Sequence, residues 1–95
     1  MYYVYILQSL KDKKFYTGFT NDVARRLQEH NNGAEFSTAH RAPFQLIYYE
    51  ACVSKTDAIT REKYLKSGKG KIFIKTRLKK YLESLCVNLY SECAI

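Results

Sequence analysis

One glutamate of the sequence lies where a carboxylate is costly. The spacing of Ala58, Ile59 and Leu65 predicts the apolar stripe of a helix over residues 54–66, and Glu62 falls in the middle of that stripe. A carboxylate on a buried stripe is unfavourable unless a cation compensates its charge. Either an Arg or Lys in a salt bridge, or a divalent cation such as Mg²⁺ or Mn²⁺, would satisfy it. Glu62 is therefore a candidate metal ligand.

A second pair of polar residues shares one flank of an earlier helix. At about 100° per residue, Arg25 projects to solvent, whereas Arg26 lies at the edge of the apolar stripe and His30 close to the stripe itself. Both therefore face the body of the protein, although an outward-reaching arginine and a purely structural histidine are the alternatives. The stripe that defines these angles consists of Val23, Ala24 and Leu27.

The overall charge favours an anionic partner. Sixteen Lys+Arg against nine Asp+Glu give a net charge of +7 at pH 7. Nucleic acid is the commonest anionic partner of a small basic domain, and a charge that only keeps the surface soluble is the alternative. The three cysteines show neither disulfide nor zinc spacing, and no apolar run approaches about 18 residues. We therefore expect a cytoplasmic protein.

The elements that must position these side chains form a small α/β (α+β) domain. Thr20 or Asn21 is expected to cap the first helix, and Ser54 and Asp57 have the spacing of a capping box for the second. The order β-β-α-β-α-α predicts a three-stranded, mostly antiparallel sheet flanked by about three helices. One domain is expected over residues 1–84, with a helix end or tail over 85–95. The predicted strands cover residues 2–7, 15–20 and 44–50, and the predicted helices cover 22–30, 54–66 and 71–85.

The last predicted helix is strongly basic. A basic helix face could follow a phosphate backbone, and a solvated charged face is the alternative. The turn at residues 67–70, with Ser37, Thr38 and Lys71, could add donors for phosphate, unless it is a plain helix-breaking turn. The candidate nucleic-acid-binding residues are Lys69, Lys71, Lys75 and Lys79.

Two aromatic triplets connect these residues to a known family. Tyr3-Val4-Tyr5 is followed after ten residues by Tyr16-Thr17-Gly18, which resembles the paired strand motif of GIY-YIG endonucleases. Tyr3, Val4 and Thr17 depart from the motif, but both tyrosines and the glycine of the second triplet are kept. Arg26, His30 and Glu62 match the family's arginine, histidine and metal-binding glutamate. The resemblance covers residues 1–82 and is strongest to short, stand-alone bacterial members related to the nuclease domain of the bacterial excinuclease.

The resemblance implies a metal-dependent endonuclease and a role for each residue. Tyr5 would be the general base on a water, with His30 polarising its hydroxyl, and Tyr16 would orient the water or phosphate. Arg26 would hold non-bridging oxygens, and Glu62 would anchor one Mg²⁺ or Mn²⁺ ion. The hairpin register leaves open an exchange of roles between the tyrosines. DNA is the expected substrate, with repair or recombination as the setting.

The last predicted helix departs from the family at one position. Many members carry an asparagine on the last helix, about a dozen residues after the glutamate, whereas this chain has Phe73-Ile74-Lys75-Thr76 there. Either another group replaces it or activity is weakened. The alternative function is a non-catalytic nucleic-acid-binding module on the same fold. A protein-binding scaffold with a tyrosine-rich surface is a third hypothesis.

Overall fold

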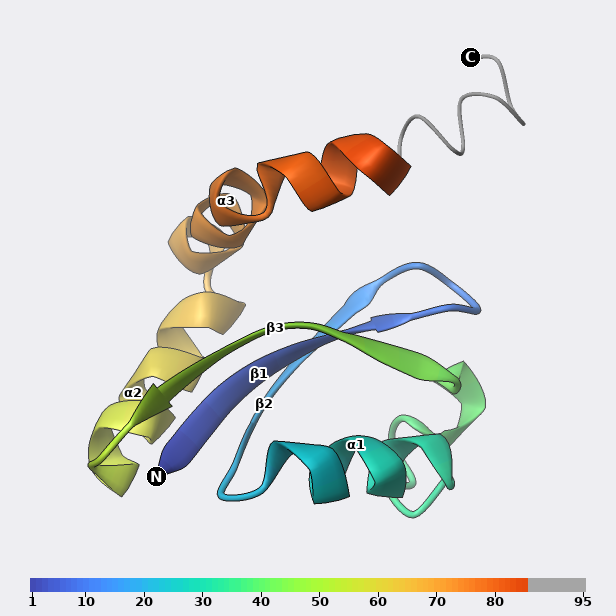
Figure 1. Ribbon diagram of the computed structural model, residues 1–95, viewed down its shortest axis with the longest axis horizontal. Helices are drawn as coiled ribbons and strands as arrows, with labels where there is room; N and C mark the ends of the chain where they lie inside the picture. Colours follow the sequence, from blue (N-terminus) through green and yellow to red (C-terminus); the bar gives the residue numbers. More distant parts are fainter. Residues whose placement is uncertain (86–95) are drawn as a thin grey trace. The chain divides into compact units, whose positions relative to one another are not determined.

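The computed structural model describes residues 1–85 (Figure 1). Its first two strands are rich in aromatic and β-branched residues and pair with each other. β1 (Tyr2–Ser9) runs antiparallel to β2 (Phe15–Thr20), and Tyr5 stands opposite Gly18. The turn between them is closed by Ser9, whose hydroxyl oxygen accepts from the backbone N–H groups of Lys11 and Asp12. The predicted hairpin is confirmed, and it places both tyrosine triplets in adjacent strands.

β3 (Phe44–Cys52) completes the sheet on the other side of β1. The strand order is β2-β1-β3 and both pairings are antiparallel, with an irregularity between Ile6 and Leu7. β3 runs two residues further than predicted because the pairing continues to Tyr2 opposite Cys52. The predicted fold class and its antiparallel sheet are confirmed for the described residues.

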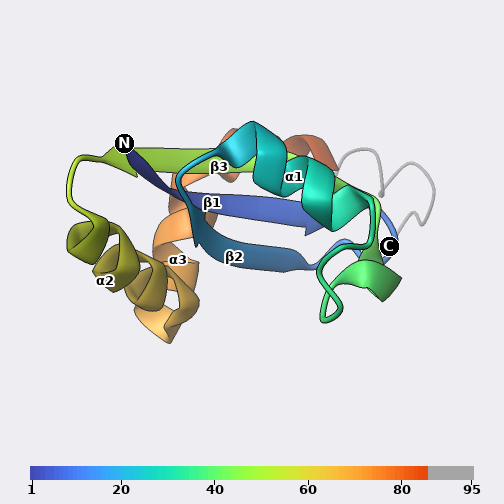
Figure 2. The ribbon, with the colours of Figure 1, turned by 90° about the horizontal axis from the view of Figure 1, so that it is seen from below.

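Helix α1 (Val23–Asn31) covers one face of this sheet (Figure 2). Its N-cap is Asp22, whose side chain accepts from the Arg25 N–H, so the predicted cap at Thr20 or Asn21 is wrong. Ala24, predicted to be buried, is exposed, and His30 is the fully buried residue of the helix. The central core under α1 consists of Tyr5, Leu7 and Phe44, against which Tyr16, Val23, Leu27, Ala42 and Leu46 pack.

A loop with a short 3₁₀ helix, η1 (Ala39–Arg41), joins α1 to β3, and α2 (Lys55–Lys66) follows β3. Ala58 and Leu65 are buried on α2, while Ile59 and Glu62 are half-buried, which agrees with the predicted stripe. The Asp57 N–H donates to the Ser54 hydroxyl, which is the first of the two hydrogen bonds of the predicted capping box. The chain divides into two compact units, Met1–Lys63 and Tyr64 onward, so the boundary falls inside α2.

The second unit contains α3 (Gly68–Arg77). Ser67 caps this helix by accepting from the Gly70 N–H, so the helix begins three residues before the predicted start at residue 71. The helix is interrupted at Leu78, and residues 79–85 are helical again. The predicted tail falls mostly outside the described residues. Across residues 1–85, no helix is long and apolar enough to cross a membrane.

Candidate active site

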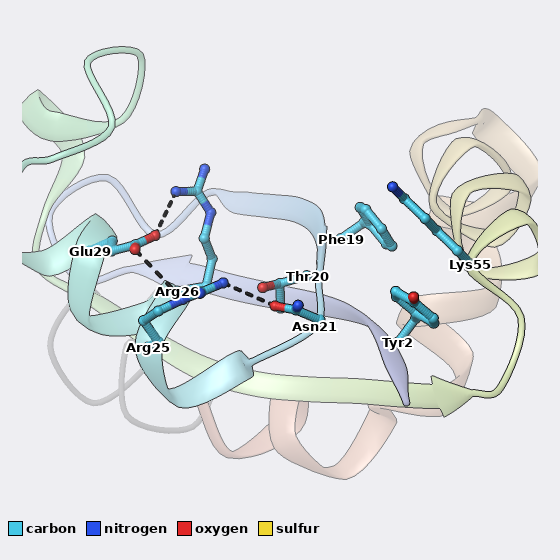
Figure 3. Close-up of a pocket in the computed structure, with 8 residues that line it drawn as sticks. All are labelled: Tyr2, Phe19, Thr20, Asn21, Arg25, Arg26, Glu29 and Lys55. Carbon is cyan, nitrogen blue, oxygen red and sulfur yellow. Dashed lines mark hydrogen bonds and ion pairs between the residues drawn. The ribbon is translucent and has the colours of Figure 1, made fainter.

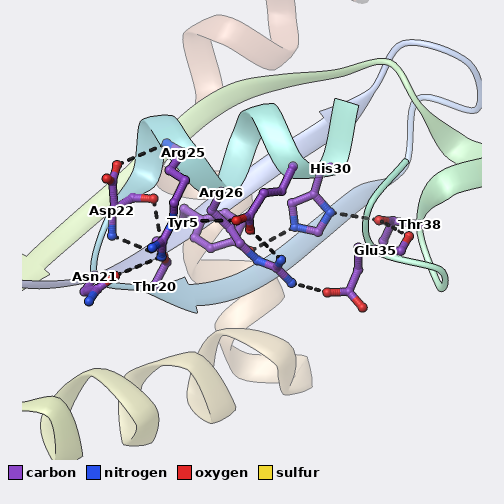
Figure 4. Close-up of polar contacts among 10 residues, drawn as sticks. Tyr5, Thr20, Asn21, Asp22, Arg25, Arg26, His30, Glu35 and Thr38 are labelled. Carbon is purple, nitrogen blue, oxygen red and sulfur yellow. Dashed lines mark hydrogen bonds and ion pairs between the residues drawn. The ribbon is translucent and has the colours of Figure 1, made fainter. Parts of the chain in front are cut away.

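Tyr5 and His30 form a buried hydrogen bond at the centre of the candidate site (Figure 4). Tyr5 comes from the middle strand and His30 from the last turn of α1, and the two residues are 1% and 0% exposed. The Tyr5 hydroxyl oxygen and the Nε2 atom of His30 are 3.0 Å apart. The strand and the helix therefore bring together two residues that lie 25 positions apart in the sequence.

The second ring nitrogen of His30 is also engaged. The Nδ1 atom lies 2.8 Å from the Thr38 hydroxyl oxygen, and that hydroxyl donates to the Glu35 carbonyl at 3.4 Å. Because the Thr38 proton is used on Glu35, the hydroxyl accepts from Nδ1–H. This arrangement assigns the lone pair of Nε2 to the Tyr5 hydroxyl, which then donates. His30 is thereby oriented to receive the proton of Tyr5.

The electrostatic surroundings keep both partners neutral near pH 7. Burial raises the pKa of Tyr5 to about 12, although the neighbouring Arg26 guanidinium lowers it; the charges of Tyr16 and Glu62 raise it further. Burial, and then the positive charge of Arg26, lower the pKa of His30 below its ordinary value. Neutral His30 can accept a proton, and Tyr5 cannot ionise by itself at neutral pH. If Tyr5 is to act as a general base, His30 must therefore accept its proton.

Arg26 lies beside this pair and is held by two carboxylates. Its Nη1 donates to Glu29 Oε1 at 3.0 Å, and its Nη2 donates to Glu35. The Glu35 carboxylate is the main reason why the pKa of Arg26 is raised, and Arg26 in turn lowers the pKa of Glu35. The side chain of Arg26 is 24% exposed, so the guanidinium is oriented yet still reaches solvent. Arg25 is exposed, as its helical angle predicts.

Tyr16 completes the aromatic wall of the site. Its ring meets the His30 ring edge-on at 4.9 Å between centroids and lies 6.3 Å from the Tyr5 ring. Tyr16 is half-buried, in contrast to Tyr5, so it is the tyrosine that reaches the surface. The structure thus distinguishes the two tyrosines by their partners and exposure.

Gly18 makes room for Tyr5. A Cβ atom at position 18 would lie 2.4 Å from the Tyr5 hydroxyl oxygen and 2.5 Å from Cζ. We expect Gly18→Ala to displace the Tyr5 ring and to lower the free energy of unfolding by about 1–3 kcal/mol, because the core is overpacked. Urea denaturation measures this loss. Gly68→Ala is the matched control, because nothing lies within 4 Å of its Cβ and alanine favours a helix. Equal stability of both variants would contradict the expectation.

Glu62 is the acidic residue of α2 whose charge acts on Tyr5. A metal of the kind that the sequence predicts would fit here, because Mg²⁺ is usually held by one or two carboxylates together with substrate phosphates. Among residues 1–85 there is no group of three or more His, Cys, Asp and Glu side chains that could hold a metal ion. The role of Glu62 as a metal ligand stays a prediction.

The residues predicted to contact phosphate or nucleic acid lie in different environments. Thr38 is 2% exposed and bonded to His30, so it is not available as a surface phosphate donor. The four candidate nucleic-acid-binding lysines are exposed, and their contact with nucleic acid stays a prediction. They are Lys69, Lys71, Lys75 and Lys79.

The residues that hold the site in place are not among those predicted from the sequence. Glu29 is three positions after Arg26 on the same helix, so its spacing was a usable signal. Glu35 and Thr38 come from an irregular loop, where no periodicity relates them to Arg26 and His30.

The chain is similar in sequence to known proteins. The GIY-YIG catalytic domain matches residues 1–81. A UPF0213 protein of Clostridium perfringens is 45% identical over 67 residues, which cover 70% of this chain and 71% of the relative. A UPF0213 protein of Haloquadratum walsbyi is 43% identical over 68 residues, covering 70% and 74%.

A solved structure is also similar. The solution NMR structure of a UPF0213 protein from Bacillus halodurans shares 39% identity and covers 80% of this chain and 84% of its own, with a TM-score of 0.48. The predicted resemblance is confirmed by the match over residues 1–81 and by the relatives. The chain belongs to the GIY-YIG family, a family of nuclease domains that act on nucleic acid.

Proposed function

We propose that this chain is a divalent-metal-dependent endonuclease that hydrolyses phosphodiester bonds in DNA, in repair or recombination. The observation that carries the proposal is the buried hydrogen bond from the Tyr5 hydroxyl to His30 Nε2, beside Arg26. A phenol that is hydrogen-bonded to a neutral imidazole can give its own proton to the imidazole while it accepts a proton from water. A guanidinium next to it can bind the phosphate whose bond is to be cut.

The proposed reaction begins with proton transfer through this pair. A water gives a proton to the Tyr5 oxygen while the proton of Tyr5 moves to His30 Nε2. The hydroxide formed attacks phosphorus, the bond from phosphorus to the 3′-oxygen breaks, and the leaving oxygen takes a proton from solvent. His30 then returns its proton through Tyr5 to solvent, which restores the starting state. This transfer avoids a free phenolate, which the pKa of about 12 for Tyr5 makes unfavourable at neutral pH.

The remaining residues act on the phosphate. Arg26 would bind its non-bridging oxygens and Tyr16, the more exposed tyrosine, would orient the water or the phosphate. Glu62 would hold the divalent cation, which would supply positive charge to the phosphate and the leaving 3′-oxygen. Glu29 and Glu35 would keep the guanidinium in place until the substrate arrives.

The proposal is tested by a cleavage screen over single-stranded, nicked, branched and duplex DNA, with RNA in parallel. We expect cleavage of at least one DNA in Mg²⁺ or Mn²⁺ and none after chelation. Glu62→Ala should raise the metal concentration for half-maximal cleavage at least about tenfold, because even outer-shell changes cost that much metal affinity.

The control and the contrary outcomes are equally specific. Glu83→Gln changes an exposed carboxylate of the second unit that pairs with Lys80, and it should leave the metal dependence unchanged. Salt-sensitive binding without cleavage of any substrate in either metal would instead identify a non-catalytic binding module. Cleavage that survives chelation would remove the metal from the proposal.

A further inference from the structure

A pocket lies next to Arg26, at the end of the hairpin where β2 leads into α1 (Figure 3). Its volume is about 400 Å³, within the roughly 300–1,000 Å³ of sites that bind small organic groups. In the proposed reaction Arg26 binds the phosphate that is cut and Glu29 holds Arg26 in place, and the other residues of this pocket have no role. The residues that give it chemical character are Tyr2, Phe19, Arg25, Arg26, Glu29 and Lys55.

Two aromatic rings form one wall of the pocket. The rings of Tyr2 and Phe19 are stacked, with centroids 6.1 Å apart and an angle of 17° between their planes. Phe19 pairs with Val4, so it points to the sheet face opposite Tyr5, and Tyr2 shares that face by strand alternation. Both residues are half-buried, and part of each ring meets solvent. We call these two nearly parallel, partly exposed rings the aromatic platform; it lies beside the candidate site and is separate from it.

Positive charge surrounds this platform. Lys55, the first residue of α2, extends toward the two rings in Figure 3. It is exposed and takes part in none of the ion pairs within residues 1–85. On the opposite side, Arg25 and Arg26 share the Glu29 carboxylate at 3.7 and 3.0 Å. Lys55 is therefore the cation of the pocket whose charge is not paired with a carboxylate of the described residues, and it can bind an anion.

An aromatic platform next to a lysine matches the chemistry of one nucleotide. A nucleobase stacks on aromatic rings through its apolar face, and a phosphate pairs with a lysine ammonium. A base in a duplex has both faces covered by its neighbours, so only an unpaired base can stack on the protein.

We propose that this pocket binds one unpaired nucleotide of the substrate, next to the phosphodiester at Arg26. The base stacks on Tyr2 and Phe19, and its phosphate pairs with Lys55. The assignment rests on the proposed function, because it takes Arg26 as the place of the scissile phosphate. It makes Tyr2, Phe19 and Lys55 positioning residues that set where along the strand the cut falls.

Abasic scanning tests the proposal by binding. The full chain, with chelator present, is titrated into a single-stranded DNA of about 12 nucleotides that carries one abasic site, moved along it position by position. For wild type we expect one position at which the missing base weakens binding about fivefold to 100-fold. For Phe19→Leu we expect a flat profile, since its platform is reduced. Phe19→Tyr keeps a ring and should restore the wild-type profile.

Lysine variants separate the phosphate contact from the stacking. Lys55→Ala should lower the slope of log affinity against log salt by about 0.7, the value for one phosphate contact on a single strand, and keep the abasic position. Lys14→Ala is the matched control, because the turn at residues 10–14 is at the far end of β1 and β2 from Tyr2. Thermal unfolding of each variant shows whether its fold is kept.

The contrary outcomes are distinct from failure of the proposed function. A flat abasic profile for folded wild type, or an unchanged profile in folded Phe19→Leu, would overturn the nucleotide pocket even if the chain cuts DNA. Failure to cut any substrate would overturn the proposed function whatever the abasic profile.

Discussion

Tyr5→Phe should lower the rate constant for DNA cleavage by about 10²- to 10⁴-fold, the range for loss of a general base. The variant removes one oxygen, and with it both the acceptor for the water proton and the donor to His30 Nε2. Affinity for DNA should change little, because the phenol contributes to the transfer of a proton and not to the binding of phosphate. Single-turnover cleavage measures the rate, and a titration under chelation measures the affinity.

Tyr49→Phe is the matched control for this variant. Tyr49 is 53% exposed on β3, and its ring packs edge-on against Tyr3. Loss of that hydroxyl should leave the cleavage rate within about twofold of wild type, since surface changes are usually near neutral. Tyr5→Phe also leaves a buried His30 nitrogen without its donor, so both variants are compared well below their unfolding temperatures. A Tyr5→Phe chain that is folded and cuts at the wild-type rate would exclude Tyr5 as the base.

Arg26→Lys should lower kcat/KM for DNA cleavage by about 10²- to 10³-fold, as found when one donor to a developing charge is removed. The charge is kept, but the planar fork that can bind two phosphate oxygens at once is lost. The fork also holds Glu29 and Glu35, so the lysine is expected to be oriented less well. Initial rates over a range of DNA concentrations, at saturating metal, give the ratio.

Arg25→Lys makes the same chemical change one residue earlier. The Arg25 side chain is 54% exposed and pairs with Glu29 and Asn21. Because it lies outside the Tyr5 and His30 cluster, we expect kcat/KM within about threefold of wild type. Equal losses in the two variants would mean that general positive charge, and not the fork of Arg26, supports cleavage.

Much of this arrangement could be predicted from local patterns. The hairpin follows from aromatic and β-branched runs around a polar turn, and helical spacing separates inward Arg26 from outward Arg25. The same spacing identifies Glu62 as a carboxylate on an apolar stripe. These inferences succeed because each depends on residues a few positions apart, where the period of the backbone decides which side chains share a face.

The ends of helices are predicted less accurately, because backbone periodicity does not decide where a helix begins. The cap of α1 is Asp22, and α3 begins at Gly68, because a cap depends on which side chain reaches a free N–H group. The sequence shows several candidate caps within two or three residues. The path of the chain selects one of them.

Local patterns in the sequence specify the strands, the helices and the types of side chain that face inward. Tertiary packing selects which of these side chains meet: Tyr5 with His30, His30 with Thr38, and Arg26 with Glu35. Those contacts join a strand, a helix and an irregular loop, and their geometry depends on how α1 lies on the sheet. No local period encodes that placement, because it results from packing around Tyr5, Leu7 and Phe44 as a whole.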